Sequence, residues 1–368
     1  MSRPAISIQK SGGWTFGSPS VLMMFYRASG ELQSELTEMD ECMPHYYKIT
    51  NGHGQGAETI MRAEADFMRA CFADAQIMLE RAYAQIDGNG QENMTLCCDF
   101  LAWRLSLCTS FTPRESFEQR REALLGLHNV TWLNILQSSC AYYYALLGLP
   151  EKIPAVFREH QLASIHFLAP GKPMMELIEN QVYLAQGEYA KVIGRSEALL
   201  GMCEAMHYAL VALHIRLQTA AAYEMLGKCE TADELLISAL AAAEPDALYL
   251  PFVENYRYLK TALTRGAGAK FAAFVRTVTP LGEDFVRRCG EKSAEGSRPA
   301  ALAGLTERES AIAALVAKRL SNREIAEQLF LSEGSVKQYI NQIYSKLLIT
   351  GNVRTKRKRL AELAAPKS

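Results

Sequence analysis

The sequence has no apolar run long enough to cross a membrane and no apolar signal-peptide core at its N-terminus. One of its longest apolar stretches, residues 205–223, is interrupted by His207, His214 and Arg216. A membrane-spanning helix needs about 20 predominantly apolar residues, so neither a span nor an export signal is predicted. The nine cysteines are odd in number and include no Cys-x-x-Cys pair, which argues against a disulfide framework. We therefore expect a cytoplasmic protein with reduced, buried thiols.

Signatures of catalysis and of cofactor binding are also missing. The sequence has no Gly-x-Ser-x-Gly elbow, no His-Glu-x-x-His pair and no phosphate-binding loop that ends in Gly-Lys-Ser/Thr. The Gly-rich residues 52–56 lack that ending and follow no strand pattern, so they predict a loop that leads into a helix. Cys203 and His207 could share a metal ion, but no second cluster supplies further ligands, and structural side chains are the better interpretation. The sequence predicts no enzyme, no cofactor and no metal site.

Charge is unevenly distributed along the 368 residues, which are 49% hydrophobic and 21% charged, as in ordinary globular proteins. Residues 298–368 hold 13 Lys and Arg against 6 Asp and Glu, a net charge of +7. Residues 1–297 hold 26 against 34, a net charge of −8. A basic terminal domain therefore follows an acidic body. Their opposite charges favour a docked state in which the acidic body covers the basic domain.

Most of the acidic body has the pattern of helices. Apolar residues recur at three- and four-residue steps in stretches rich in Ala, Leu, Glu and Arg, and no strand pattern occurs. We predict six antiparallel helix pairs, over residues 57–87, 92–127, 131–168, 174–203, 207–243 and 247–289. Residues 1–56 are poorly defined, with helix candidates near 21–26 and 32–39. Residues 290–301 are small, polar and contain Gly and Pro, so they predict a linker to a last domain over 302–368.

A repeat is visible in the breaks between the predicted helices. Gly148, Gly187 and Gly227 each end one helix and open another, and they are 39 and 40 residues apart. Glycine lets the first helix end and the second pack closely, so the repeated hairpins indicate a solenoid. Leu226-Gly227 with Ala239 is similar to a tetratricopeptide repeat, and the longer period resembles the superhelix of MalT-type regulators. The alternative is a helical domain without repeats.

Two capping boxes and a third cap open the helices of the last domain. Thr306 stands three residues before Glu309, and Ser321 stands three residues before Glu324. Ser332 is the third cap. The boxes predict helices over 306–319, with Ile312, Leu315 and Val316 inward, and over 322–329, with Ile325, Ala326 and Leu329 inward.

The helix that follows Ser332 has two distinct faces. Its apolar residues recur at i, i+4, i+7 and i+11, namely Val336, Ile340, Ile343 and Leu347. Its other face carries hydrogen-bonding side chains that suit a DNA major groove, namely Ser335, Lys337, Gln338, Asn341, Gln342 and Ser345. The short turn Phe330-Leu331 has the length expected between the two helices of a helix-turn-helix.

The motifs of this domain are Leu305-Thr306-x-Arg308-Glu309, Leu320-Ser321-Asn322-x-Glu324-Ile325-Ala326, Leu329-x-Leu331-Ser332, Ser335-Val336-Lys337 and Lys346-Leu347. Over about 55 residues they resemble the LuxR-type DNA-binding domain, a four-helix module of bacterial transcription regulators. The resemblance implies that side chains of the third helix touch bases or phosphates and that one residue of the second helix contacts the DNA backbone. The predicted DNA-binding residues are Asn322, Ser332, Ser335, Lys337, Gln338, Asn341 and Lys346.

The residue types agree with these roles. Lys337 can donate to guanine O6 and N7, while Gln338 and Asn341 can pair with adenine N6 and N7. Ser332 and the free amides at the start of its helix suit a phosphate.

The domain departs from the LuxR-type pattern at three positions and in one segment. Ser335 and Tyr339 stand where the family often has Thr and His, and Leu348 stands where it commonly has Gly. The segment before the family's fourth helix, frequently a dimer contact, carries the cations of residues 354–359. Cations at a helix N-terminus oppose the helix dipole, so we expect them to lie against phosphates or in solvent. The oligomeric state stays open.

The sequence predicts an all-α protein, a TPR-like superhelix of helical hairpins followed by a LuxR-type helix-turn-helix domain. Its predicted function is that of a sequence-specific transcriptional regulator that binds double-stranded DNA. Its helical array would sense a small molecule, a peptide or a protein, and RNA polymerase would be a further partner. Larger MalT-type regulators carry an ATPase module ahead of the array, so the sequence is either a short form or part of a longer chain. The alternative function is an interaction scaffold whose basic end binds acidic partners.

Overall fold

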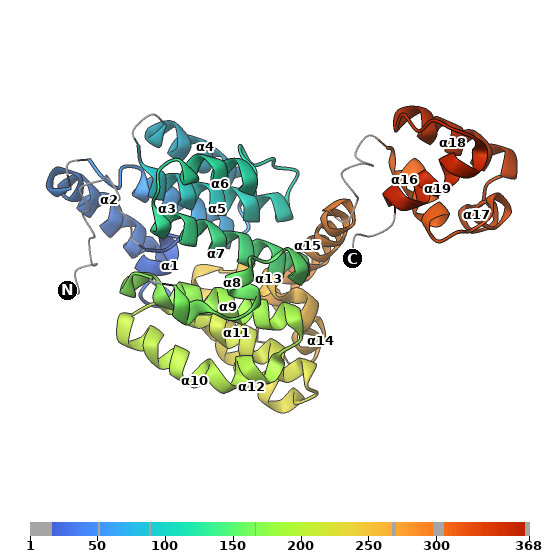
Figure 1. The fold of residues 1–368 in the computed structure, drawn as a ribbon. Helices are drawn as coiled ribbons and strands as arrows, with labels where there is room; N and C mark the ends of the chain where they lie inside the picture. The colour runs from blue at the N-terminus through green and yellow to red at the C-terminus, as the bar shows by residue number, and fades with distance from the viewer. Residues whose placement is uncertain are drawn as a thin grey trace. The chain divides into compact units, whose positions relative to one another are not determined.

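A computed structural model describes the chain over residues 17–50, 52–87, 90–165, 167–266, 270–296 and 305–364. Throughout these ranges the secondary structure consists of helices joined by turns, without a strand, which confirms the all-α prediction. No helix of the described ranges is long and apolar enough to cross a membrane. The chain divides into two compact units, Met1–Cys289 and Gly290–Ser368. We call them the helical unit and the C-terminal unit (Figure 1).

The helical unit contains the helices α1 to α14 and most of α15. Their bounds are α1 Leu22–Phe25, α2 Leu32–Ile49, α3 Ala57–Met68, α4 Phe72–Ile86, α5 Glu92–Cys108, α6 Phe117–Leu125, α7 Val130–Leu147, α8 Ala155–Arg158, α9 Lys172–Gln186, α10 Tyr189–Met206, α11 Ala209–Met225, α12 Cys229–Ala243, α13 Leu250–Glu254, α14 Tyr256–Gly266 and α15 Ala272–Gly296. Short 3-10 helices occupy Pro150–Lys152, Leu162–Ser164, Ala169–Gly171 and Glu244–Asp246.

Four of the six predicted pairs form, and two do not. The helices α3 and α4, α9 and α10, and α11 and α12 pack as neighbours, and Figure 1 shows α9 to α12 side by side. The pair predicted over 92–127 consists of α5 and α6, which an ion pair between Asp99 and Arg120 connects. The predicted pair over 131–168 is wrong, because α7 is followed by only a four-residue helix and short 3-10 turns. Pro150 and Pro154 lack the amide that a continuing helix needs. The predicted pair over 247–289 is also wrong, because three helices, α13 to α15, occupy this region.

The three glycines of the predicted repeat lie where helices end. Gly148, Gly187 and Gly227 have φ angles of 72°, 77° and 72° and follow α7, α9 and α11. A residue with a side chain is strained in this left-handed conformation, so glycine is the natural helix terminator here. The predicted role of these glycines as chain breaks is confirmed, while a TPR-like repeat stays a prediction.

Described residues 17–50 contain more helix than the sequence indicates. Val21 and Leu22 are completely buried, and the Leu22 N–H donates to Glu64 Oε2 at 2.7 Å. Burial raises the pKa of the Glu64 carboxyl to about 7. The second candidate helix, predicted near 32–39, continues through Pro44 to Ile49 as α2. Because their apolar side chains join the core, described residues 17–50 belong to the helical unit.

A buried ion pair lies at the centre of this core. Arg104 on α5 and Glu254 on α13 are each 1% exposed, and Nε lies 2.8 Å from Oε1. Tyr142 on α7 donates its hydroxyl to Glu254 Oε2 at 2.8 Å. The guanidinium carbon of Arg104 is 4.9 Å from the ring centre of Phe67 on α3 and 5.2 Å from that of Phe100. One arginine therefore connects four helices.

The helix α15 continues into the region predicted to be a linker. It ends at Gly296, so residues 290–296 are helical. Glu291, Lys292 and Ala294 are good helix formers, and they outweigh the small polar character of the segment. The remaining predicted linker residues, 297–301, lie outside the described residues.

Candidate nucleic-acid interface

Within the C-terminal unit, described residues 305–364 form four helices around a hydrophobic core of their own. Its helices are α16 Glu307–Ala317, α17 Asn322–Leu329, α18 Glu333–Lys346 and α19 Val353–Ala364 (Figure 1). The buried core residues are Leu305, Ile312, Ala313, Val316, Ile325, Ala326, Val336, Ile340, Ile343, Tyr344, Ile349 and Leu360. Leu315, Leu329 and Leu347, which the sequence predicts to face inward, are only partly buried against this core.

Both predicted capping boxes form. The Glu309 N–H donates to Thr306 Oγ1 at 3.3 Å, and the Thr306 N–H donates to the Glu309 carboxylate at 2.8 Å. The same exchange joins Ser321 and Glu324 at 3.3 and 2.7 Å. Each box satisfies amides that the first turn of a helix leaves without partners, and so it fixes where α16 and α17 begin.

The turn between α17 and α18 sets the direction of α18. Phe330 has a left-handed conformation with φ 52°, and the Leu331 N–H donates to Ala326 O at 2.9 Å. Ser332 then caps α18, because its Oγ accepts from the Ser335 N–H at 3.0 Å. This short turn joins two helices that pack on one another, as in a helix-turn-helix.

The outer face of α18 is polar, and its central side chains have no partner among the described residues. Lys337, Gln338 and Asn341 are exposed, while Val336 and Ile340 of the same helix are buried. None of the three exposed side chains makes a hydrogen bond or an ion pair with another described residue. They lie within about one turn of each other, since a turn is 3.6 residues. They can therefore meet a ligand together.

Ser332 and Ser335 lie at the N-terminus of the same helix. Their hydroxyl oxygens are 2.8 Å apart and share a hydrogen bond. Ser332 is exposed and Ser335 is half-buried. The Ser332 hydroxyl is engaged in the cap, so the ability of this end to hold an anion depends chiefly on the first backbone amides of α18.

Lys346 is separated from the other predicted residues. It lies nine residues beyond Lys337, about 13 Å along the helix axis. Its Nζ donates to Glu309 Oε2 at 2.7 Å, and its side chain is 43% exposed, against 4% for Glu309. Burial alone would raise the pKa of Glu309, but the hydrogen bonds from Lys346 and Thr306 outweigh it and lower this pKa. Lys346 therefore ties α18 to the first turn of α16.

Asn322 is also held within the C-terminal unit. Its Oδ1 accepts from Arg357 Nη1 at 2.8 Å, and Arg357 Nη2 donates to Leu320 O at 2.6 Å. Arg357 is half-buried, so the expectation that all cations of residues 354–359 lie against phosphates or in solvent is wrong for this one. The sequence does not distinguish Arg357 from its neighbours, because it lies inside a run of five cations in six residues. Its role becomes visible only when α19 packs in the folded unit.

The cations of residues 354–359 lie within α19, whereas the sequence placed them in the segment before this helix. The Asn352 Oδ1 accepts from the Thr355 N–H at 2.9 Å, so the helix begins at Val353. The exposed cations of this run are Arg354, Lys358 and Arg359. They add positive charge to the surface of the C-terminal unit.

Leu348 has an unfavourable backbone conformation, and its replacement gives a test of the local structure. Its φ is 52°, its N–H donates to Ser345 O, and the next N–H, that of Ile349, donates to Tyr344 O. This is a Schellman cap, which normally has glycine at the left-handed position. Because the side chain is 85% exposed, Leu348→Gly is expected to stabilise the C-terminal unit by about 1 kcal/mol.

Hydrogen exchange of the α16 to α19 amides in the full chain measures this gain. Leu348→Ala is the matched control, because it shortens the side chain but keeps a Cβ in the strained conformation. An equal gain from Leu348→Ala would contradict the strain argument.

Metal chemistry finds no support among the residues that the structure describes. No three His, Cys, Asp or Glu side chains come close enough together there to hold an ion. Cys203 and His207 do not share a helical face, because α10 ends at Met206 and His207 has a left-handed φ of 56°. His214 lies on α11 and is completely buried.

Comparison with known proteins supports the resemblance seen in the C-terminal unit. Residues 303–357 match the sequence model of the bacterial regulatory proteins of the LuxR family. The transcriptional regulatory protein LnrK of Bacillus subtilis is 44% identical over 55 residues, which are 15% of this chain and 25% of that protein. The DNA-binding transcriptional activator DevR/DosR of Mycobacterium tuberculosis is 39% identical over 46 residues, 12% of this chain and 21% of that protein. This chain covers 25% and 21% of the length of these two relatives.

Proposed function

We propose that this chain is a sequence-specific transcriptional regulator that reads double-stranded DNA with α18. The observation that carries the proposal is the outer face of this helix, where Lys337, Gln338 and Asn341 are exposed and make no hydrogen bond or ion pair with another described residue. A helix of this kind fits the major groove, in which each base pair presents a distinct set of donors and acceptors. The match of residues 303–357 to the LuxR family supports the same role.

In this proposal the side chains in the middle of the exposed face of α18 read the bases. Lys337 donates to guanine O6 and N7, and the amides of Gln338 and Asn341 pair with adenine N6 and N7. The N-terminal amides of α18, beside Ser332 and Ser335, take a phosphate. Phosphate contacts fix the register of the protein on the duplex, and base contacts specify the sequence.

Asn322 and Lys346 would contact phosphates at the two edges of the interface. Arg357 occupies Oδ1 of Asn322, which leaves the two amide hydrogens on Nδ2 as donors. Glu309 takes one donor of Lys346, and an ammonium group has three. Each side chain is thus held in position while it keeps a donor for DNA. The exposed cations Arg354, Lys358 and Arg359 add attraction that does not depend on sequence.

The helical unit would act as the sensor in this proposal. Its hairpins, with glycines at the helix ends, support a TPR-like array similar to that of MalT-type regulators. An effector that binds the array would change how the C-terminal unit is presented to DNA and to RNA polymerase in the cytoplasm. No step requires catalysis. Docking between the acidic and basic parts stays a prediction, as does the alternative that the chain is a scaffold for acidic partners.

Selection from a pool of random duplexes tests the proposal. The full chain is expected to enrich one sequence family and to bind it in the presence of excess non-specific DNA. Its affinity should fall more than about tenfold between 50 and 200 mM salt, because phosphate contacts release counterions. An acidic polypeptide serves as the matched competitor. If no sequence is enriched and the polypeptide competes as well as DNA, the scaffold is the correct function.

A further inference from the structure

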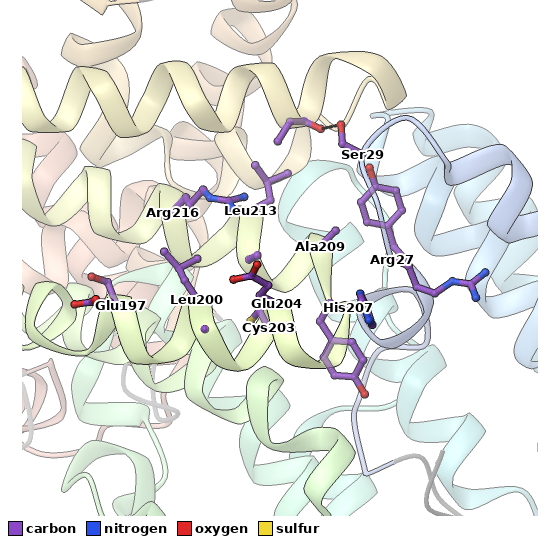
Figure 2. Close-up of a pocket in the computed structure, with 16 residues that line it drawn as sticks. Arg27, Ser29, Glu197, Leu200, Cys203, Glu204, His207, Ala209, Leu213 and Arg216 are labelled. Atoms are coloured by element: carbon purple, nitrogen blue, oxygen red, sulfur yellow. Dashed lines mark hydrogen bonds between the residues drawn. The ribbon is translucent and has the colours of Figure 1, made fainter. Parts of the chain in front are cut away.

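The helical unit contains a hollow that the DNA-binding role does not use. The hollow has a volume of about 820 Å³, within the range of about 300–1,000 Å³ found for sites that hold small molecules. The helices α10 and α11 provide most of its lining, and α12 and residues 26–29 complete it. In Figure 2, Arg27 and Ser29 lie at one end and Glu197 lies at the other.

Charged groups of both signs line this hollow without neutralising each other. Arg216 of α11 is half-buried, while Glu197 and Glu204 of α10 are exposed. None of these three side chains has a hydrogen-bond or ion-pair partner among the described residues. Arg27, in contrast, is bound by Glu35 and Glu38. The hollow therefore offers one free cation and two free carboxylates.

Part of the hollow that α11 forms is an apolar floor, and on the α10 side one lining residue, Gly201, has no side chain. Leu213 is 1% exposed and lines the floor beside Ala212. Gly201 lies in the interior of α10, where glycine is destabilising by about 0.5–1 kcal/mol relative to Ala. No atom within 4 Å would obstruct a Cβ there, so packing inside the chain does not require this glycine. A larger side chain at this position would occupy space that the hollow now offers.

We propose that this hollow binds a short peptide with free amino and carboxyl termini. Arg216 binds the carboxylate, since a guanidinium matches it with two parallel hydrogen bonds. Glu197 and Glu204 line the same hollow as Arg216, and both carboxylates are exposed. One of them binds the ammonium group, and the apolar floor holds the peptide side chains.

A peptide in this hollow would be the effector that the helical unit senses. Its effect on DNA binding rests on the proposed function, but peptide binding itself does not. Binding is therefore measured without DNA. A failure to bind peptide would leave the readout by α18 untouched, and a failure to select DNA would leave peptide binding untouched.

The test uses the full chain and a mixed pool of tripeptides and tetrapeptides with free termini at millimolar concentration. We expect the pool to raise the melting temperature of the helical unit, because a ligand that binds only the folded state stabilises it. The same pool with acetylated amino ends and amidated carboxyl ends should have no effect. Fractionation and calorimetry then identify the binding peptides and their affinity.

Two glycines of α10 give a matched pair of variants. Gly201 lines the hollow, whereas Gly194, two turns earlier, does not, and neither would have a neighbour within 4 Å of its Cβ. Gly201→Leu is expected to lower peptide affinity at least about tenfold, and Gly194→Leu should leave it unchanged. Arg216→Gln should also lower it at least about tenfold, because it removes a hydrogen bond between charged groups.

Three results would overturn the proposal. They are the absence of stabilisation by the free-terminus pool, equal stabilisation by the blocked pool, and equal loss of affinity in the two glycine variants. Both glycine variants gain a better helix former, so each is expected to fold.

Discussion

The double variant Lys337→Ala/Asn341→Ala is expected to lose its preference for the selected duplex. Each good contact between a side chain and a base edge contributes about 1–3 kcal/mol of discrimination, so affinity should fall by about 2–6 kcal/mol if the two add. Both side chains are exposed and without partners in the described chain, so the stability of the C-terminal unit should change by less than about 0.5 kcal/mol. Gel-shift titration against the selected duplex and a scrambled duplex measures the loss.

Arg354→Ala is the matched control for this prediction. Arg354 is an exposed cation of the same unit, but it lies on α19 and would contact only phosphates. Its loss should weaken binding to both duplexes equally and reduce the salt dependence by about one phosphate contact. If the double variant still distinguished the two duplexes as the parent chain does, α18 would not be the reading helix.

Glu254→Gln is expected to destabilise the helical unit by about 3–5 kcal/mol, because it leaves the guanidinium of Arg104 buried without its counter-charge. Both side chains are 1% exposed, so water cannot replace the lost partner. The amide that remains can still accept from Tyr142, which confines the change to the charge. Urea unfolding of the full chain, followed by far-ultraviolet circular dichroism, measures the shift of the helical transition.

An exposed ion pair provides the control for this second prediction. Lys260 and Glu283 are 3.1 Å apart, with side chains 62% and 55% exposed, and Glu283→Gln should cost less than about 1 kcal/mol. The triple variant Arg104→Met/Glu254→Leu/Tyr142→Phe removes the ion pair together with the hydroxyl that binds it. It should be more stable than Glu254→Gln, because the guanidinium is no longer buried without its counter-charge. Equal effects of Glu254→Gln and Glu283→Gln would refute a structural role for the buried pair.

The candidate interface was predictable from the sequence because its signals are local. Thr306 and Glu309, and Ser321 and Glu324, are three residues apart, and such pairs meet on any helix that begins there. The two faces of α18 follow from the helical period alone. The predictions that fail in this unit, such as the free cations of residues 354–359, concern partners that are distant in sequence.

The helical unit was less predictable for the same reason. Apolar periodicity identified helices but not their extent, because prolines such as Pro150 and Pro154 interrupted a predicted hairpin. The N-terminal helices α1 and α2 are short or polar in pattern, and they are stable because they pack on the core. Apolar periodicity predicts which face of a helix is buried, but it does not predict which other helix packs against that face.

The sequence by itself determined the helical class, the helix caps and the polar face of α18, because each depends on residues within about two turns of one another. Only the tertiary structure decided the partners across helices. Arg357 meets Asn322 over 35 residues, Lys346 meets Glu309 over 37, and Arg104 meets Glu254 over 150. It also decided the hollow beside Arg216, whose walls come from three helices and a distant loop. Such contacts depend on how helices pack against each other, and many packings are compatible with the same local pattern.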